Sequence, residues 1–127
     1  GDKVALASFP YQGKLNRSTL SEGILREMED LQGDRNKFRF SVSIEPGDSG
    51  GGIFDSSGNF IGLHITHPTS KENSDAQIAI KVREINKFLH DTGSLELKRS
   101  YRNTPLDLEQ IESMANKVTA LISCWEN

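Results

Sequence analysis

The stretch that decides the fold is IEPGDSGGGIFDSSGNFIGLHI, residues 44–65. Near its start, Ser49 stands among glycines, with Gly47 two residues before it and Gly50 directly after it. Two short apolar segments follow and are separated by the turn residues SSGN, 56–59. Apolar segments joined by a turn of this composition are typical of a β-hairpin. The stretch therefore predicts a hairpin that follows an exposed serine.

Short apolar or alternating segments on either side of this stretch predict further strands. In FRFSVSI, residues 38–44, large apolar residues alternate with polar ones, which is the pattern of a half-buried strand. The segment Leu20–Met28 contains helix-forming residues, but Gly23 interrupts it and no helical period holds, so a strand is expected there. The predicted strands are Val4–Phe9, Leu20–Met28, Phe38–Ile44, Ile53–Asp55, Phe60–Thr66 and Ala76–Ile80.

Two helices are predicted after the strands. The first contains Val82, Ile85, Phe88 and Leu89 at helical spacing, and Gly93 supplies a left-handed stop. The second begins with Thr104 as N-cap and Pro105 in the first turn. Its apolar stripe consists of Leu108, Ile111, Ala115, Val118, Ile122 and Trp125. The chain is thus expected to be all-β, with six short strands, a closing helix and an additional C-terminal helix.

Composition excludes several classes of protein. The chain has 127 residues and a net charge of -3, which fits one domain and does not favour nucleic-acid binding. No apolar run approaches the roughly 20 residues that span a bilayer. Cys124 is the sole cysteine and cannot close an internal disulfide, so the compartment stays open. The chain starts at Gly1 rather than at methionine, so we expect it to come from a longer reading frame or to follow processing.

The glycines around Ser49 allow two interpretations, a catalytic site and a structural turn. Glycine allows backbone conformations that other residues avoid, so the amides of Gly47 and Ser49 can point into one cavity while the serine stays exposed. Such amides stabilise the oxyanion that forms when a serine attacks a carbonyl group. The alternative is a tight turn in which the serine only bonds to its own backbone. Spacing alone leaves both interpretations open.

The string PGDSGGGIFDSSGNFIGLHI resembles the nucleophile segment of the chymotrypsin-like serine endopeptidases. GDKVALASFPYQGKLN resembles the strand and loop that these domains carry ahead of the nucleophile, and AQIAIKVREINKFL resembles their last strand and closing helix. The GLH of residues 62–64 is similar to the GIH of the glutamyl-endopeptidase and exfoliative-toxin branch. This resemblance covers about residues 1–91 and implies the second, C-terminal, six-stranded β-barrel of a two-barrel enzyme.

What the resemblance implies can be assigned residue by residue. Ser49 matches the nucleophile, and the amides of Gly47 and Ser49 match the oxyanion hole. Asp48 matches the position that pairs with a newly freed amino terminus in chymotrypsin-like zymogens, although the glutamyl branch usually has Asn there. Neither His67 nor His90 has carboxylates at ligand spacing, so no metal or cofactor is expected.

The histidine and aspartate of the family's catalytic triad lie ahead of the serine, on the first barrel. All three histidines of this chain, His64, His67 and His90, follow Ser49 and none matches the triad position. The resemblance therefore implies half of an enzyme whose base lies in a missing N-terminal barrel. The parent is either an intact protease acting on polypeptides or a protein that uses the barrel as a scaffold without catalysis.

The resemblance also implies a pocket for the substrate side chain before the cleaved bond. His64 matches the histidine that binds an acidic side chain in the glutamyl branch, and strand alternation is expected to place it on the face opposite Ile61, Leu63 and Ile65. Ser43 stands where trypsin-like members carry an aspartate, which disfavours basic substrates. The candidate substrate-binding residues are Ser43, His64, Ile65, Thr66 and Gln77.

One departure weakens the expected acidic preference. The glutamyl branch usually has Thr or Ser five residues before the nucleophile, and this chain has Ile44 there. Ser43 or Gln77 would have to replace that ligand, and a small or uncharged polar side chain is the alternative substrate residue.

The chain is expected to divide into residues 1–92, the C-terminal half of a trypsin-like peptidase domain, and residues 93–127, a linker and an amphipathic helix. The second part has no counterpart in the resemblance. Its apolar stripe either packs on the barrel or docks onto another domain or subunit, in which case Trp125 would be a suitable anchor.

Overall fold

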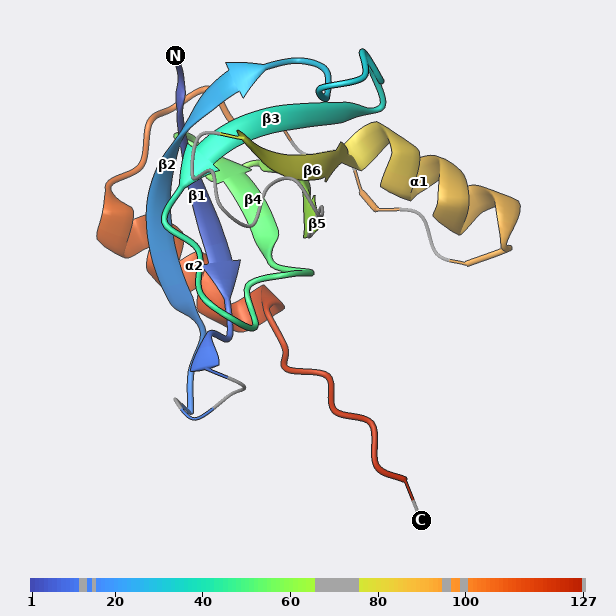
Figure 1. The fold of residues 1–127 in the computed structure, drawn as a ribbon. Helices are drawn as coiled ribbons and strands as arrows, with labels where there is room; N and C mark the ends of the chain where they lie inside the picture. The colour runs from blue at the N-terminus through green and yellow to red at the C-terminus, as the bar shows by residue number, and fades with distance from the viewer. Residues whose placement is uncertain (12–13, 15, 66–75, 95–96, 99–100, 127) are drawn as a thin grey trace.

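The computed structural model describes residues 1–11, 14, 16–65, 76–94, 97–98 and 101–126. Within these residues the antiparallel strands close into a barrel in the order β1-β2-β3-β6-β5-β4 (Figure 1). The elements are β1 (Lys3–Ser8), β2 (Thr19–Glu27), β3 (Lys37–Val42), β4 (Gly52–Asp55), β5 (Phe60–Ile65), β6 (Gln77–Lys81), α1 (Val82–Asp91) and α2 (Leu108–Val118). The predicted all-β barrel with a closing helix and an additional C-terminal helix is confirmed.

The strand predictions agree with the structure to within one or two residues at each end. The uncertain segment at residues 20–28 forms β2, which pairs with β1 on one side and with β3 on the other. Thr66, predicted as the last residue of its strand, lies outside the described residues.

Side chains from facing strands fill the barrel. The buried apolar residues of this core are Val4, Leu6, Phe38, Phe40, Val42, Ile53 and Ala79. Two polar side chains, His64 and Gln77, are also fully buried, with exposures of 2% and 1%. The His64 ring stands edge-on to Phe40, with 5.7 Å between the ring centroids.

The predicted alternation along β5 is confirmed, with His64 on the face opposite Ile61, Leu63 and Ile65. Gly62 and His64 are the buried residues of this strand, whereas Ile61 and Leu63 are only half-buried. Since Gly62 has no side chain, β5 can approach β6 so closely that an added Cβ atom would lie 2.4 Å from the carbonyl oxygen of Ile80. The outer face of β5 carries apolar residues because α1 packs against it.

Helix α1 ends as the sequence predicts. Gly93 has a φ of 71°, in the left-handed region, and its amide donates to the carbonyl of His90 at 3.1 Å. The next amide, that of Ser94, donates to Leu89 at 2.8 Å and completes the helix stop.

Helix α2 is shorter than predicted at both ends. Asp107 is the N-cap, not Thr104, because the Asp107 and Gln110 side chains each accept the other's backbone amide, at 2.8 and 3.0 Å. The helix ends at Val118, and the next residue, the β-branched Thr119, is extended. The predicted stripe therefore stops at Val118, and Trp125, 91% exposed, lies beyond the helix.

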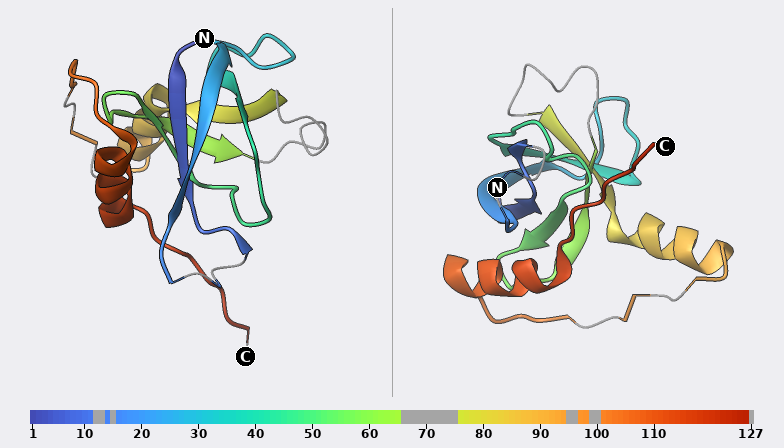
Figure 2. Two further views of the ribbon diagram at one scale, coloured as in Figure 1. Left: turned by 90° about the vertical axis from the view of Figure 1, so that its left-hand side faces the viewer. Right: turned by 90° about the horizontal axis from the view of Figure 1, so that it is seen from below.

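Helix α2 packs on the outside of the barrel, at a different place from α1 (Figure 2). Its contact with the barrel is a second apolar cluster of Ala5, Ala7, Phe54, Ile111 and Ala115. The segment that follows α2 leaves the helix near the end of β1 and runs away from the barrel (Figure 1). Among the described residues, no helix is long and apolar enough to cross a lipid bilayer.

Candidate active site

Ser49 lies in the loop that connects β3 to β4, at the end of the barrel where β1 also ends (Figure 1). Ser49 is exposed, whereas the preceding residue, Asp48, is buried with an exposure of 4%. The Asp48 carboxylate accepts hydrogen bonds from the Ser8 hydroxyl at 2.5 Å and from the Glu45 amide at 2.6 Å. The carboxylate therefore links the loop to β1 through Ser8 and also links two residues within the loop, Asp48 and Glu45.

The residues before Ser49 form a tight turn. The Asp48 amide donates to the carbonyl of Glu45 at 3.1 Å, which places Pro46 and Gly47 in the centre of the turn. Gly47 has a φ of 102°. Proline followed by a residue with positive φ is the arrangement of a type II turn, and glycine suits that second position because it has no Cβ atom.

The orientation of the Gly47 amide follows from its neighbour. The Pro46 carbonyl accepts a hydrogen bond from the Tyr11 amide at 2.8 Å, and the described peptide bonds are trans. Since the C=O and N–H of a trans peptide point in opposite directions, the Gly47 N–H faces away from Tyr11.

The Ser49 amide is oriented in the same way. The Asp48 carbonyl accepts from the Gly51 amide at 3.0 Å and from Nδ1 of His64 at 3.1 Å. The Ser49 N–H, on the other side of that peptide, therefore faces away from the buried imidazole. A Cβ atom at Gly51 would lie 2.7 Å from the carbonyl oxygen of Ala7, so this glycine is needed for close packing against β1.

Both residues that carry these amides line one cavity, which has a volume of about 310 Å³. Its walls are Ser8, Phe9, Gly47, Ser49, Gly50, Gly51 and residues 119–122 of the C-terminal segment. Among the described residues, none accepts a hydrogen bond from the Gly47 or Ser49 amide, and none bonds to the Ser49 hydroxyl. Within the described part of the chain, the Ser49 hydroxyl and the amides of Gly47 and Ser49 therefore have no protein partner.

The candidate substrate-binding residues occupy different surroundings. His64 and Gln77 lie side by side in the barrel interior, with Nε2 of His64 3.1 Å from the side-chain oxygen of Gln77. Ser43 is exposed on the loop and Ile65 is half-buried at the end of β5, while Thr66 lies outside the described residues.

Two residues of the site were not predicted from the sequence. Ser8 and Tyr11 hold the loop through the Asp48 carboxylate and the Pro46 carbonyl. They reach it because β1 pairs with β4, directly after the loop. No local pattern marks these two residues, since only the pairing of distant strands brings them to Ser49.

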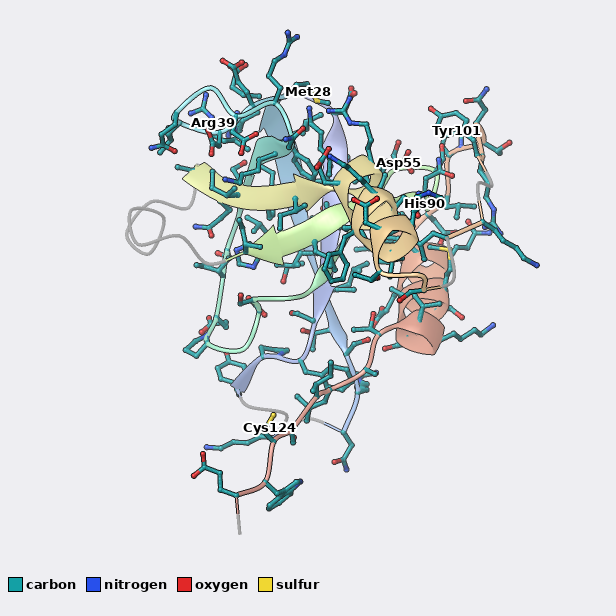
Figure 3. All side chains as sticks on the ribbon, turned by 90° about the vertical axis from the view of Figure 1, so that its right-hand side faces the viewer. Met28, Arg39, Asp55, His90, Tyr101 and Cys124 are labelled. Atoms are coloured by element: carbon teal, nitrogen blue, oxygen red, sulfur yellow. The ribbon has the colours of Figure 1, made fainter. Side chains whose placement is uncertain are left out.

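The structure identifies no base for Ser49 within the described residues. The His64 ring is buried against Asp48 and Gln77, and His90 lies in the last turn of α1 (Figure 3). The same residues contain no cluster of His, Cys, Asp and Glu that could hold a metal ion.

Comparison with known proteins places the fold among the trypsin-like peptidases. The family described as "Trypsin-like peptidase domain" matches residues 1–63. Exfoliative toxin A from Staphylococcus aureus is 38% identical over 64 residues, which are 50% of this chain and 21% of the toxin. The crystal structure of Rv3671c from M. tuberculosis H37Rv, a Ser-to-Ala mutant in an inactive form, superposes with a TM-score of 0.54 at 18% identity.

The fold is chymotrypsin-like. The resemblance of the chain to the trypsin-like serine peptidases is therefore confirmed, and these relationships support a protease-like function. The superposition with Rv3671c covers 78% of this chain and 51% of that structure. This chymotrypsin-like chain thus spans about half of the similar structure and about a fifth of the toxin.

Proposed function

We propose that this chain is the nucleophile-bearing part of a serine endopeptidase that hydrolyses peptide bonds. In this proposal Ser49 attacks the peptide carbonyl, and the Gly47 and Ser49 amides stabilise the resulting oxyanion. The observation that carries the proposal is that both peptides flanking this site have their carbonyls bonded to other groups, at Pro46 and at Asp48. Their N–H groups are thereby fixed in orientation before any substrate binds.

A histidine and an aspartate outside this chain complete the proposed machinery. The histidine takes the proton of the Ser49 hydroxyl as the bond to the carbonyl carbon forms, and later donates it to the leaving amine. We place both residues in an N-terminal barrel, so that residues 1–92 form the C-terminal half of the peptidase domain. Residues 93–127 are then a linker and an amphipathic C-terminal helix. Without the base, the chain would hydrolyse peptides very slowly.

The proposal includes a preference for an acidic residue before the cleaved bond. It rests on the match of His64 to the pocket histidine of the glutamyl branch, with Ser43 or Gln77 in place of the usual second ligand. Because Nε2 of His64 lies against Gln77, a substrate carboxylate would have to displace the Gln77 side chain to bind the ring. A fluorogenic peptide panel on the full-length protein tests this preference, and cleavage after Ala or Leu that equals cleavage after Glu contradicts it.

The alternative is a catalytically silent module that binds a partner through this site or through the C-terminal segment. It is favoured by the observation that no base bonds to Ser49 within the described residues. A fluorophosphonate probe distinguishes the two functions, because it reacts only with an activated serine. The proposal expects labelling of the full-length protein at Ser49 and none in the Ser49→Ala variant. Absence of labelling in the unmodified protein would leave the binding module as the function.

A further inference from the structure

We propose that His64 is a positioning residue of the oxyanion hole: its ring holds the Asp48 carbonyl and thereby orients the Ser49 amide. This inference rests on the proposed function and deepens it. It gives His64 a role that does not depend on which residue precedes the cleaved bond.

The contacts of the ring define this role. A carbonyl oxygen only accepts hydrogen bonds, so the 3.1 Å contact between Nδ1 of His64 and the Asp48 oxygen requires a proton on Nδ1. Nε2 lies 3.1 Å from the side-chain amide of Gln77. A neutral ring accepts there from the NH2 group of that amide, and a charged ring donates to its oxygen. In both states, Gln77 holds the ring in the orientation that serves Asp48.

Burial makes the hydrogen bond between His64 and the Asp48 carbonyl costly to lose. The Asp48 carbonyl lies beside a ring that is 2% exposed, where water cannot readily replace a lost donor. The ring is also fixed edge-on against Phe40. Removing the imidazole would leave the Asp48 carbonyl with the hydrogen bond from the Gly51 amide. With only that bond left, the Asp48–Ser49 peptide would be held less firmly, and the direction of the Ser49 N–H would be less well fixed.

The backbone of the same residue strengthens the link between β5 and the serine loop. The Gly50 amide donates to the His64 carbonyl at 2.8 Å, and the His64 amide donates to the Gly51 carbonyl at 2.9 Å. Three hydrogen bonds therefore join His64 to the residues on either side of Ser49. The two backbone bonds fix where β5 meets the loop, and the ring adds the third bond at the Asp48 carbonyl.

Two substitutions separate positioning from substrate binding. In His64→Asn, the side-chain amide nitrogen takes a place close to that of Nδ1 and still donates to Asp48, whereas His64→Leu fills a similar volume without a donor. We expect His64→Leu to lower kcat by at least about tenfold, with little change in KM. The upper limit is the loss of about 10²–10³-fold that is typical when an oxyanion donor is deleted. The loss of kcat should appear for peptides with Ala or Leu before the bond as well as for those with Glu, which lose in addition whatever His64 contributes as a ligand. His64→Asn should recover most of the kcat for peptides with Ala or Leu.

An inhibitor pair provides a second readout in the full-length protein. A peptidyl trifluoromethyl ketone forms an oxyanion with the serine, whereas a product peptide does not. His64→Leu should weaken the binding of the ketone by a factor similar to its loss of kcat. The affinity for the product peptide should stay unchanged. If the buried substitution prevents folding, Gln77→Met tests the same link, because it removes the ring's Nε2 partner, and it should give a smaller loss of the same kind.

The outcomes distinguish this inference from the function on which it rests. If the unmodified protein neither cleaves peptides nor reacts with a fluorophosphonate, both fall together. If it does react, the His64→Leu variant decides the role of the ring. A rise in KM that is confined to peptides with Glu makes the ring a substrate ligand and overturns the positioning role. Unchanged kinetics in folded His64→Leu overturn it as well.

Discussion

The Tyr11 amide donates a 2.8 Å hydrogen bond to the Pro46 carbonyl, and this bond fixes the peptide that leads into Gly47. The peptide keeps its orientation only while Gly47 adopts a φ of 102°. An alanine is strained there by about 1–2 kcal/mol, which favours rotation of the peptide and changes the direction of the Gly47 N–H. We predict that Gly47→Ala lowers kcat of the full-length protein by about 10²–10³-fold.

Gly33 provides the matched control for this prediction. It also has a positive φ, 80°, and an added Cβ atom would meet nothing within 4 Å. Gly33→Ala should therefore lower the free energy of unfolding by a similar amount without changing kcat. Equal effects of the two substitutions on kcat would contradict the proposed role of Gly47.

The bond between Ser8 and Asp48 leads to a second prediction. Ser8→Ala removes one donor from a carboxylate that is 4% exposed, and an unsatisfied buried polar group costs about 1–3 kcal/mol. We expect the free energy of unfolding to fall by this amount and labelling of Ser49 to slow, since the loop loses its tie to β1. Ser113→Ala, at an exposed position of α2, is the control and should change neither quantity measurably.

Much of the fold can be predicted from local pattern, but most of the site cannot. The alternation of β3 and the turn chemistry before β5 predict strands because both signals lie within a few residues. Alternation places His64 opposite Ile61, Leu63 and Ile65, but it does not show which of the two faces is the inner one. His64 is polar, and its bonds to Asp48 and Gln77 satisfy it inside the barrel.

The C-terminal helix shows the same limit. The helical spacing of its apolar residues continues to Trp125, but this spacing does not predict where capping and tertiary contacts end the helix. Asp107 takes the N-cap because Gln110 completes a reciprocal pair, and the Leu106 amide donates to the Ser56 carbonyl at 2.9 Å. The start of this helix is thus set by a capping box within its own sequence, and the contact with Ser56 adds a tie to the barrel that the helix sequence does not show.

The docking of α2 gives a third prediction. Ile111 is 5% exposed and packs against Ala5 and Phe54, so Ile111→Ala should lower the free energy of unfolding by about 2–5 kcal/mol. Val118 on the same helix is 68% exposed, and Val118→Ala should have little effect. Chemical denaturation of the two variants provides the measurement. Equal, small effects would mean that α2 does not contribute to the stability of the barrel in solution.

The turn between β2 and β3 contains a group of charges that predicts a pH dependence. The Asp30 carboxylate accepts from the amides of Asp34 and Gln32, each at 2.9 Å, and lies 3.3 Å from the Lys37 ammonium. These bonds, the one from Asp34 above all, hold the pKa of Asp30 below its ordinary value of 3.8. The Asn36 amide and Lys37 lower the pKa of Asp34 in the same way.

A carboxyl group with a lowered pKa in the folded state stabilises the protein above its ordinary pKa. This contribution is lost as the pH falls through the folded value. Asp30→Asn should therefore be less stable than the unmodified protein at neutral pH, and the difference should shrink as the pH falls below 3.8. Denaturation midpoints measured across this range test the prediction, with Asp2→Asn as a control at an exposed carboxylate. A difference that stays constant with pH would mean that Asp30 acts through its shape in the turn and not through its charge.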